Sequence, residues 1–91
     1  MRINITSKSS ELLITISHQV VGGYFNLSLM LPDAKNIQFK NNETLDDVLY
    51  ILRMLSEYKF ISSLSNELTR KIQEKFRDAK QNGREFNYEV D

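Results

Sequence analysis

His18 is the only histidine of the chain, so it is the first side chain to consider for acid–base chemistry. A lone histidine can act as a general base when a nucleophile lies within hydrogen-bond reach. The sequence has no cysteine, and none of its serines stands in a nucleophile-elbow context. We therefore expect His18 to be a half-exposed hairpin residue beside a turn at Gly22-Gly23, and we expect no catalytic residues.

Metal and cofactor sites also find little support in the residue types. One histidine without cysteines leaves only carboxylates as ligands, and these suit weak Ca²⁺ or Mg²⁺ sites. Asp46 and Asp47 are adjacent, so on a helix they point in different directions, and a role at a helix N-terminus explains both. Gly22-Gly23 is not followed by the helix that a phosphate-binding loop requires. We expect no cofactor, no metal and no enzymatic activity.

Basic residues in the C-terminal part of the chain offer a possible nucleic-acid surface. The whole-chain charges cancel, with 12 Lys and Arg against 12 Asp and Glu, whereas nucleic-acid binders usually carry a basic excess. The basic side of a helix predicted over residues 62–82, with the basic residue after it, consists of Arg70, Lys71, Arg77, Lys80 and Arg84. Acidic residues interleave at spacings that allow Glu67–Lys71 and Glu74–Arg77 ion pairs. A nucleic-acid-associated regulator is therefore an alternative function.

A predicted helix with apolar residues on two sides favours protein binding. One stripe suits a core: Leu45, Val48, Leu49, Leu52 and Leu55. The stripe roughly opposite consists of Tyr50, Met54, Tyr58 and Ile61. Such a helix must be covered on both sides, and Tyr and Met are enriched at protein interfaces. We expect a sheet to cover the first stripe and a second helix to cover the second.

If the second helix leaves that stripe open, Tyr50, Met54 and Tyr58 form the partner-binding surface. A further candidate is the outer face of the predicted sheet around Tyr24 and Met30. The partner in either case is expected to be another protein, or a second copy of the chain in a structural homodimer.

Strand periodicity dominates residues 1–40. Apolar residues alternate with polar ones around Ile3 and Ile5, from Glu11 to Ser17, and from Tyr24 to Leu31. Gly22-Gly23 favours a hairpin turn, and Pro32 ends the strand before it. A further short strand covers 36–40, with Ile37 and Phe39 expected to face inward. These strands predict an antiparallel meander with one buried face.

Helical periodicity follows over residues 44–81. Thr44 to Asp47 resembles a capping box, and we place a break near residues 58–63, where Ser62 or Ser63 offers a second N-cap. The second helix carries an apolar stripe, and Asn82-Gly83 ends it; the stripe is Leu64, Leu68, Ile72, Phe76 and Ala79. One continuous helix of about 38 residues is the alternative, and its length would favour a dimer. Phe86, Tyr88 and Val90 alternate with polar residues and predict a final strand.

These elements predict one domain, residues 1–91, of the α+β class. We expect an antiparallel sheet of three to five strands, begun by the N-terminal meander, with two C-terminal helices on one face and a final strand. No run approaches the roughly 20 apolar residues of a membrane span, and the N-terminus lacks the apolar core of a signal peptide. The expectation is a cytoplasmic protein without a membrane partner.

In size, composition and element order, the chain resembles small accessory proteins of phages and prophages from AT-rich bacterial hosts. It has 91 residues and no cysteine, and residues with AT-rich codons (Lys, Asn, Ile, Tyr and Phe) number 32, against 11 with GC-rich codons (Gly, Ala, Arg and Pro). Some such proteins are anti-CRISPR or other anti-defence inhibitors with helices packed on a small sheet. The resemblance implies a non-enzymatic inhibitor or regulator of a host protein, such as a CRISPR effector. The DNA-mimicking members are strongly acidic, unlike this neutral chain.

Overall fold

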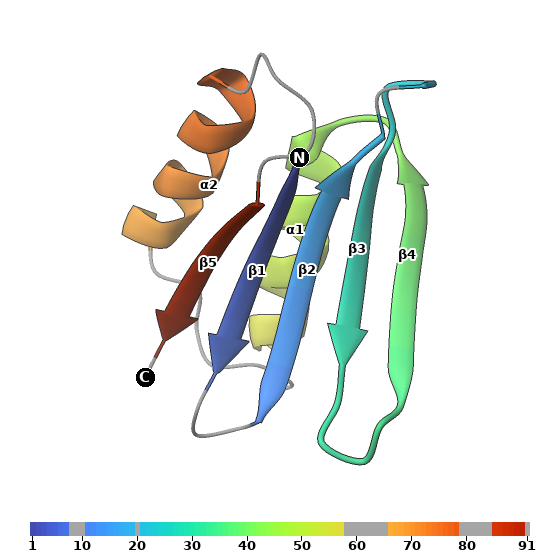
Figure 1. The fold of residues 1–91 in the computed structure, drawn as a ribbon, viewed down its shortest axis with the longest axis vertical. Helices are drawn as coiled ribbons and strands as arrows, with labels where there is room; N and C mark the ends of the chain where they lie inside the picture. The colour runs from blue at the N-terminus through green and yellow to red at the C-terminus, as the bar shows by residue number, and fades with distance from the viewer. Residues whose placement is uncertain (8–10, 20, 58–65, 79–84, 91) are drawn as a thin grey trace.

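The computed structural model describes residues 1–7, 11–19, 21–57, 66–78 and 85–90. They form a five-stranded sheet and two helices, and the helices follow the first four strands (Figure 1). The elements are β1 (Arg2–Ser7), β2 (Leu12–His18), β3 (Phe25–Met30), β4 (Asn36–Asn42), α1 (Leu45–Glu57), α2 (Asn66–Asp78) and β5 (Glu85–Val90). The α+β fold class predicted from the sequence is confirmed.

The first four strands form the predicted antiparallel meander. Each strand pairs with the next along the chain, in the order β1, β2, β3, β4. Gly22 and Gly23 adopt positive φ angles of 90° and 69° in the connection between β2 and β3, where a side chain would be strained. The amide of Gln19 donates to the carbonyl of Tyr24 at 2.8 Å across this connection. The turn predicted at the two glycines is therefore confirmed.

The final strand gives the sheet a mixed character that differs from the expected antiparallel one. β5 pairs in parallel with β1, and the complete strand order is β4-β3-β2-β1-β5. Parallel neighbours cannot be joined by a tight hairpin, and here the rest of the fold separates β1 from β5. The alternation of Phe86, Tyr88 and Val90 predicted the strand, but alternation carries no information about the direction or neighbour of a strand.

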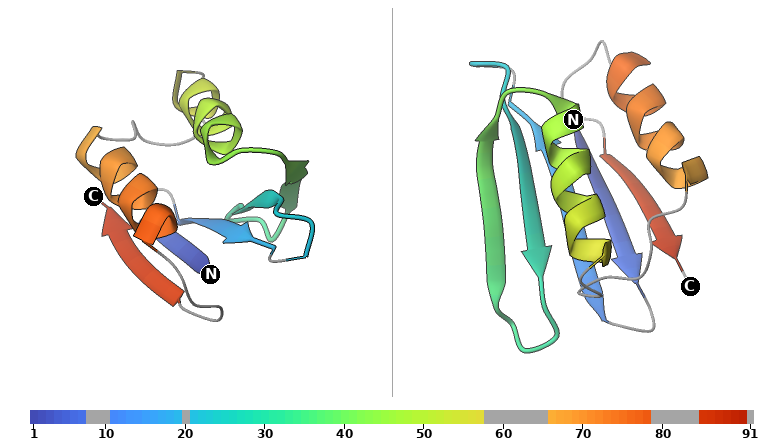
Figure 2. Two further views of the ribbon diagram at one scale, coloured as in Figure 1. Left: turned by 90° about the horizontal axis from the view of Figure 1, so that it is seen from above. Right: turned by 180° about the vertical axis from the view of Figure 1, so that it is seen from behind.

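The buried apolar residues of the described part of the chain form one hydrophobic core between the sheet and the helices. Both helices cover the same face of the sheet (Figure 2). The buried apolar residues are Ile3, Ile5, Leu12, Ile14, Ile16, Leu27, Leu29, Val48, Leu49, Leu52, Leu68 and Ile72. Phe39 is half-buried as expected, but Ile37 is 41% exposed, because β4 is an edge strand with a neighbour on one side only.

The helical region consists of two helices rather than one continuous helix. α1 ends at Glu57 and α2 begins at Asn66, so the prediction of two helices is confirmed, and the predicted position of the break, residues 58–63, lies outside the described residues. The predicted caps at Ser62 or Ser63 and the stop at Asn82-Gly83 lie outside the described residues. The predicted capping box is present at the start of α1: the Asp47 amide donates to Thr44 Oγ1 at 3.2 Å, and the Thr44 amide donates to Asp47 Oδ2 at 3.3 Å. Neither described helix has the length and apolar character needed to cross a membrane.

Candidate functional site

The side of α1 that faces away from the sheet holds two large apolar side chains in solvent. Tyr50 is 65% exposed and Met54 is 41% exposed. The two residues are four apart on one helix, so their side chains are neighbours. A helix turns by about 100° per residue, which places both roughly opposite the fully buried Leu52. α1 therefore buries one of its two apolar stripes and exposes the described part of the other.

The expectation that the second helix covers this stripe is wrong at Tyr50 and Met54. α2 lies beside α1 on the same sheet face and not over its outer side (Figure 2). The narrow apolar stripe of α2 faces the sheet, and its residues Leu68 and Ile72 are part of the common core. Because α2 has a single apolar stripe, no apolar side remains for α1. Tyr58, Ile61, Leu64 and Ala79 lie outside the described residues.

Charged side chains border the two apolar ones. Asp47 precedes Tyr50 by three residues on the same side of α1, and Arg53 lies on the flank; both are exposed. Apolar anchors within a polar rim are the usual anatomy of a protein interface. We call the group Asp47, Tyr50, Arg53 and Met54 the α1 outer surface.

The other predicted protein-binding pair, Tyr24 and Met30, is not brought together. Met30 is 38% exposed beside its cross-strand partner Leu13, which is also 38% exposed. Tyr24 is 39% exposed and precedes β3, with its ring 3.1 Å from the position that a Cβ on Gly22 would occupy. Six residues of extended chain separate the two by about 20 Å. The two side chains are therefore not neighbours, and each would meet a different part of a partner.

Part of the predicted nucleic-acid surface on α2 is engaged within the molecule. Lys71 Nζ lies 3.5 Å from Glu67 Oε1, as predicted, and Arg70 Nε lies 4.0 Å from Glu74 Oε1. The ammonium group of Lys75 lies 4.3 Å above the ring of Phe86 on β5. Arg77 is exposed at the end of α2, and the last two predicted residues, Lys80 and Arg84, lie outside the described part. Arg70 and Lys71 thus have acidic neighbours on their own helix, and Lys75 contacts the sheet.

His18 belongs to an aromatic cluster at one end of the core. Its ring stacks on Phe25 at 4.4 Å, and Phe25 meets Phe76 of α2 edge-on at 5.4 Å. His18 is half-buried, as expected, and its amide donates to the carbonyl of Met1 at 3.1 Å. Within the described ranges, no three histidine, aspartate or glutamate residues gather into a group that could hold a metal ion.

The outer face of the sheet carries a polar network that the sequence analysis did not single out. Asn4 donates to Asn87 at 3.0 Å and accepts from Thr15 at 3.0 Å, and thus links three strands. Ser28 of β3 donates to Asn36 of β4 at 3.0 Å. The signal for this network is the polar half of each alternating strand pattern. Comparisons with protein-family models, with curated proteins and with solved structures found no match to this chain.

Proposed function

We propose that this protein is a non-enzymatic protein-binding module whose contact surface is the α1 outer surface. The observation that supports the proposal is the exposure of Tyr50 and Met54 on a helix whose other side is fully packed. Large apolar side chains exposed next to each other mark interaction sites more often than single ones do. Tyr is also among the residues that dominate binding energy at interfaces.

The resemblance to phage accessory proteins adds the proposal that the partner is a host protein, such as a CRISPR effector, which the binding inhibits or regulates in the cytoplasm. Nucleic-acid binding through α2 receives less support. Lys71 and Arg70 have acidic neighbours on their own helix, and Lys75 lies over an aromatic ring. A phosphate backbone would have to compete with these contacts.

The test is capture of partners from the lysate of an AT-rich bacterial host, with the wild type and two variants. The first variant, Tyr50→Ala with Met54→Ala, removes both anchors. The control variant, Val21→Ala, truncates an apolar side chain that is 91% exposed in the connection between β2 and β3. Truncating two central anchors is expected to weaken binding by about a hundredfold, because each costs roughly 1–2 kcal/mol.

The expected result is one host protein recovered at near-stoichiometric amounts with the wild type and with the control, and lost with the double variant. Circular dichroism should show the same fold for all three proteins. If all three proteins recover the same amount of the host protein, the α1 outer surface is not the contact surface. If the wild type recovers no host protein at near-stoichiometric amounts, the protein-binding function is contradicted. Sedimentation at micromolar concentration tests the homodimer alternative. If the wild type and the control sediment as dimers and the double variant sediments as a monomer, the partner at the α1 outer surface is a second copy of the chain and not a host protein.

A further inference from the structure

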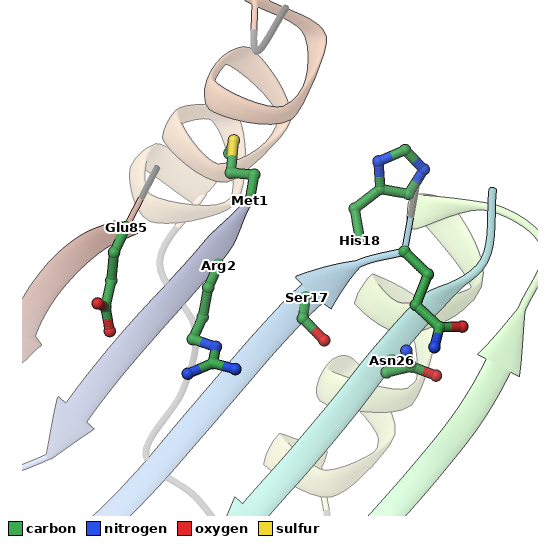
Figure 3. Close-up of a pocket in the computed structure, with 7 residues that line it drawn as sticks. Met1, Arg2, Ser17, His18, Asn26 and Glu85 are labelled. Carbon is green, nitrogen blue, oxygen red and sulfur yellow. The ribbon is translucent and has the colours of Figure 1, made fainter. Parts of the chain in front are cut away.

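The outer face of the sheet, opposite the helices, is hollowed near the start of β1. Two adjoining hollows of about 440 and 380 Å³ lie there, and both are lined by Arg2, Ser17, Gln19 and Asn26. The second extends to β4, where Lys40 lines it. Figure 3 shows Arg2, Ser17 and Asn26 side by side on three neighbouring strands, with α1 behind the sheet. This region is therefore separated from the α1 outer surface by the full thickness of the sheet.

Strand register places the lining residues in one row. Arg2 is the cross-strand partner of Ser17, and Ser17 is the partner of Asn26. A register shift between β3 and β4 leaves Lys40 and Asn41 together opposite Asn26, and Asn41 has a positive φ of 62°. Four strands at their usual spacing span about 14 Å. Two cationic side chains, Arg2 and Lys40, thus stand at the ends of a row of neutral polar groups.

Hydrogen bonding within the sheet leaves mainly donors free in this row. Asn26 Oδ1 accepts the amide of Asn41 at 2.9 Å, so the Asn26 Nδ2 group remains available as a donor. Among the residues that the structure describes, Arg2 and Lys40 form no ion pair and no side-chain hydrogen bond. A guanidinium offers five donors and an ammonium three, and neither accepts. Such a set matches an anion with several acceptor oxygens.

Glu85, the one carboxylate among the residues that line the two hollows, is hydrogen-bonded to Asn4 and not to Arg2. Glu85 is the β5 neighbour of Arg2, but its Oε1 accepts a hydrogen bond from Asn4 Nδ2. The same Asn4 amide group also donates to Asn87 at 3.0 Å. Glu85 therefore lowers the local positive potential without occupying the donors of the Arg2 guanidinium.

The size and lining of the hollows favour a small ligand over a nucleic-acid strand. Single-stranded nucleic acids are held largely by stacking of bases on aromatic rings, and no outer-face position of the described strands is aromatic. Hydroxyl and amide groups such as those of Ser17 and Gln38 suit the hydroxyl groups of a sugar. We propose that this hollow binds a small phosphate ester, with the phosphate at Arg2 and the polar body directed along the row toward Lys40.

The test is titration of the isotope-labelled full chain, followed by amide chemical shifts, with four probes. Adenosine monophosphate and glucose 6-phosphate represent the two sources of a phosphate ester, inorganic phosphate represents the anion alone, and adenosine is the uncharged control. One or both esters are expected to shift the amides of residues 2, 17, 26 and 40 more strongly than inorganic phosphate does. Adenosine should shift none, and binding should weaken as NaCl rises from about 20 to 200 mM.

Charge variants test the assigned roles. Arg2→Gln should raise the dissociation constant about tenfold or more, because charge-assisted hydrogen bonds are lost, and Lys40→Gln should raise it about threefold. Glu85→Gln should tighten binding about twofold to threefold, since it removes the neighbouring negative charge. Lys35→Gln is the matched control, because Lys35 is equally charged but pairs with Asp33 at 3.6 Å in the β3–β4 turn.

Two results would overturn the proposal. One is a wild type that shows no localised shifts with either ester at millimolar concentration. The other is equal weakening by Arg2→Gln and Lys35→Gln, which would indicate non-specific attraction of anions. The Tyr50→Ala, Met54→Ala variant should bind the esters like the wild type, so a failure of the α1 surface and a failure of this site are distinguishable.

Discussion

The two helices have the same length and pack on the same face of the sheet, yet their solvent-facing sides differ. α1 and α2 each have 13 residues and lie on one face of one sheet. The exposed side of α2 is polar and carries the Glu67–Lys71 and Arg70–Glu74 neighbours, whereas the exposed side of α1 carries Tyr50 and Met54. The charges of α2 also suit the helix dipole, with Glu67 in the first turn and Lys75 and Arg77 in the last. α2 thus has the polar outer side that is usual for a surface helix, whereas α1 exposes apolar side chains on its outer side.

The inner sides of the helices are expected to contribute equally to stability. Leu52 of α1 and Ile72 of α2 are both fully buried. Leu52→Ala and Ile72→Ala should each lower the free energy of unfolding by about 2–5 kcal/mol, measured by urea denaturation with an unchanged m-value. Tyr50→Ala removes a larger side chain from an exposed position and serves as the control. A cost below about 1 kcal/mol for Ile72→Ala alone would mean that α2 adds little to the cooperative core.

The cap of α1 should have the next largest effect. Thr44→Ala removes the hydroxyl that accepts the Asp47 amide, and loss of such a cap costs about 1 kcal/mol. Thr44→Ser keeps the hydroxyl and should retain most of the stability. Equal urea midpoints for Thr44→Ala and the wild type would show that the α1 terminus gains nothing from the capping box.

The outer side of α1 should matter for binding and little for folding. Tyr50→Ser combined with Met54→Ser is expected to change the free energy of unfolding by no more than about 0.5 kcal/mol per site, as surface substitutions do. Gln73→Ser, at an exposed position of α2, is the matched control. A large drop in thermal stability of the double variant would give the stripe a structural role and weaken the comparison between the helices.

The ion pair on the outer side of α2 should have the smallest effect. The Glu67 and Lys71 side chains are 68% and 49% exposed, and such pairs four residues apart contribute about 0.3–0.5 kcal/mol. Glu67→Gln should cost this amount at low salt and nothing near 1 M NaCl, where charges are screened. A double-mutant cycle with Lys71→Gln isolates the pair, and a salt-independent cost would assign the effect to helix propensity instead.

The sequence predicts the apolar residues of the α1 outer surface, but it does not predict that these residues are exposed. The spacing of Tyr50 and Met54 predicts a second apolar stripe on α1, and the sequence also predicts that the second helix covers this stripe. The burial of Leu68 and Ile72 in the common core shows why it does not: a narrow stripe can face only one neighbour. The polar hollow at Arg2 could not be predicted from the sequence, because only the strand register shows which polar residues of the four strands lie side by side.

The sequence by itself determined the local structure: the alternating strands, the turn at Gly22-Gly23, the capping box at Thr44 and the break between two helices. These features depend on neighbouring residues, whose periodicity and conformational preferences can be read directly. Only the tertiary structure decided that β5 joins β1 in parallel, that α2 lies beside α1, and that Arg2 and Lys40 share one row. Those outcomes depend on contacts between residues far apart in the chain, where several arrangements satisfy the same hydrophobic pattern and the packing of the whole core selects one.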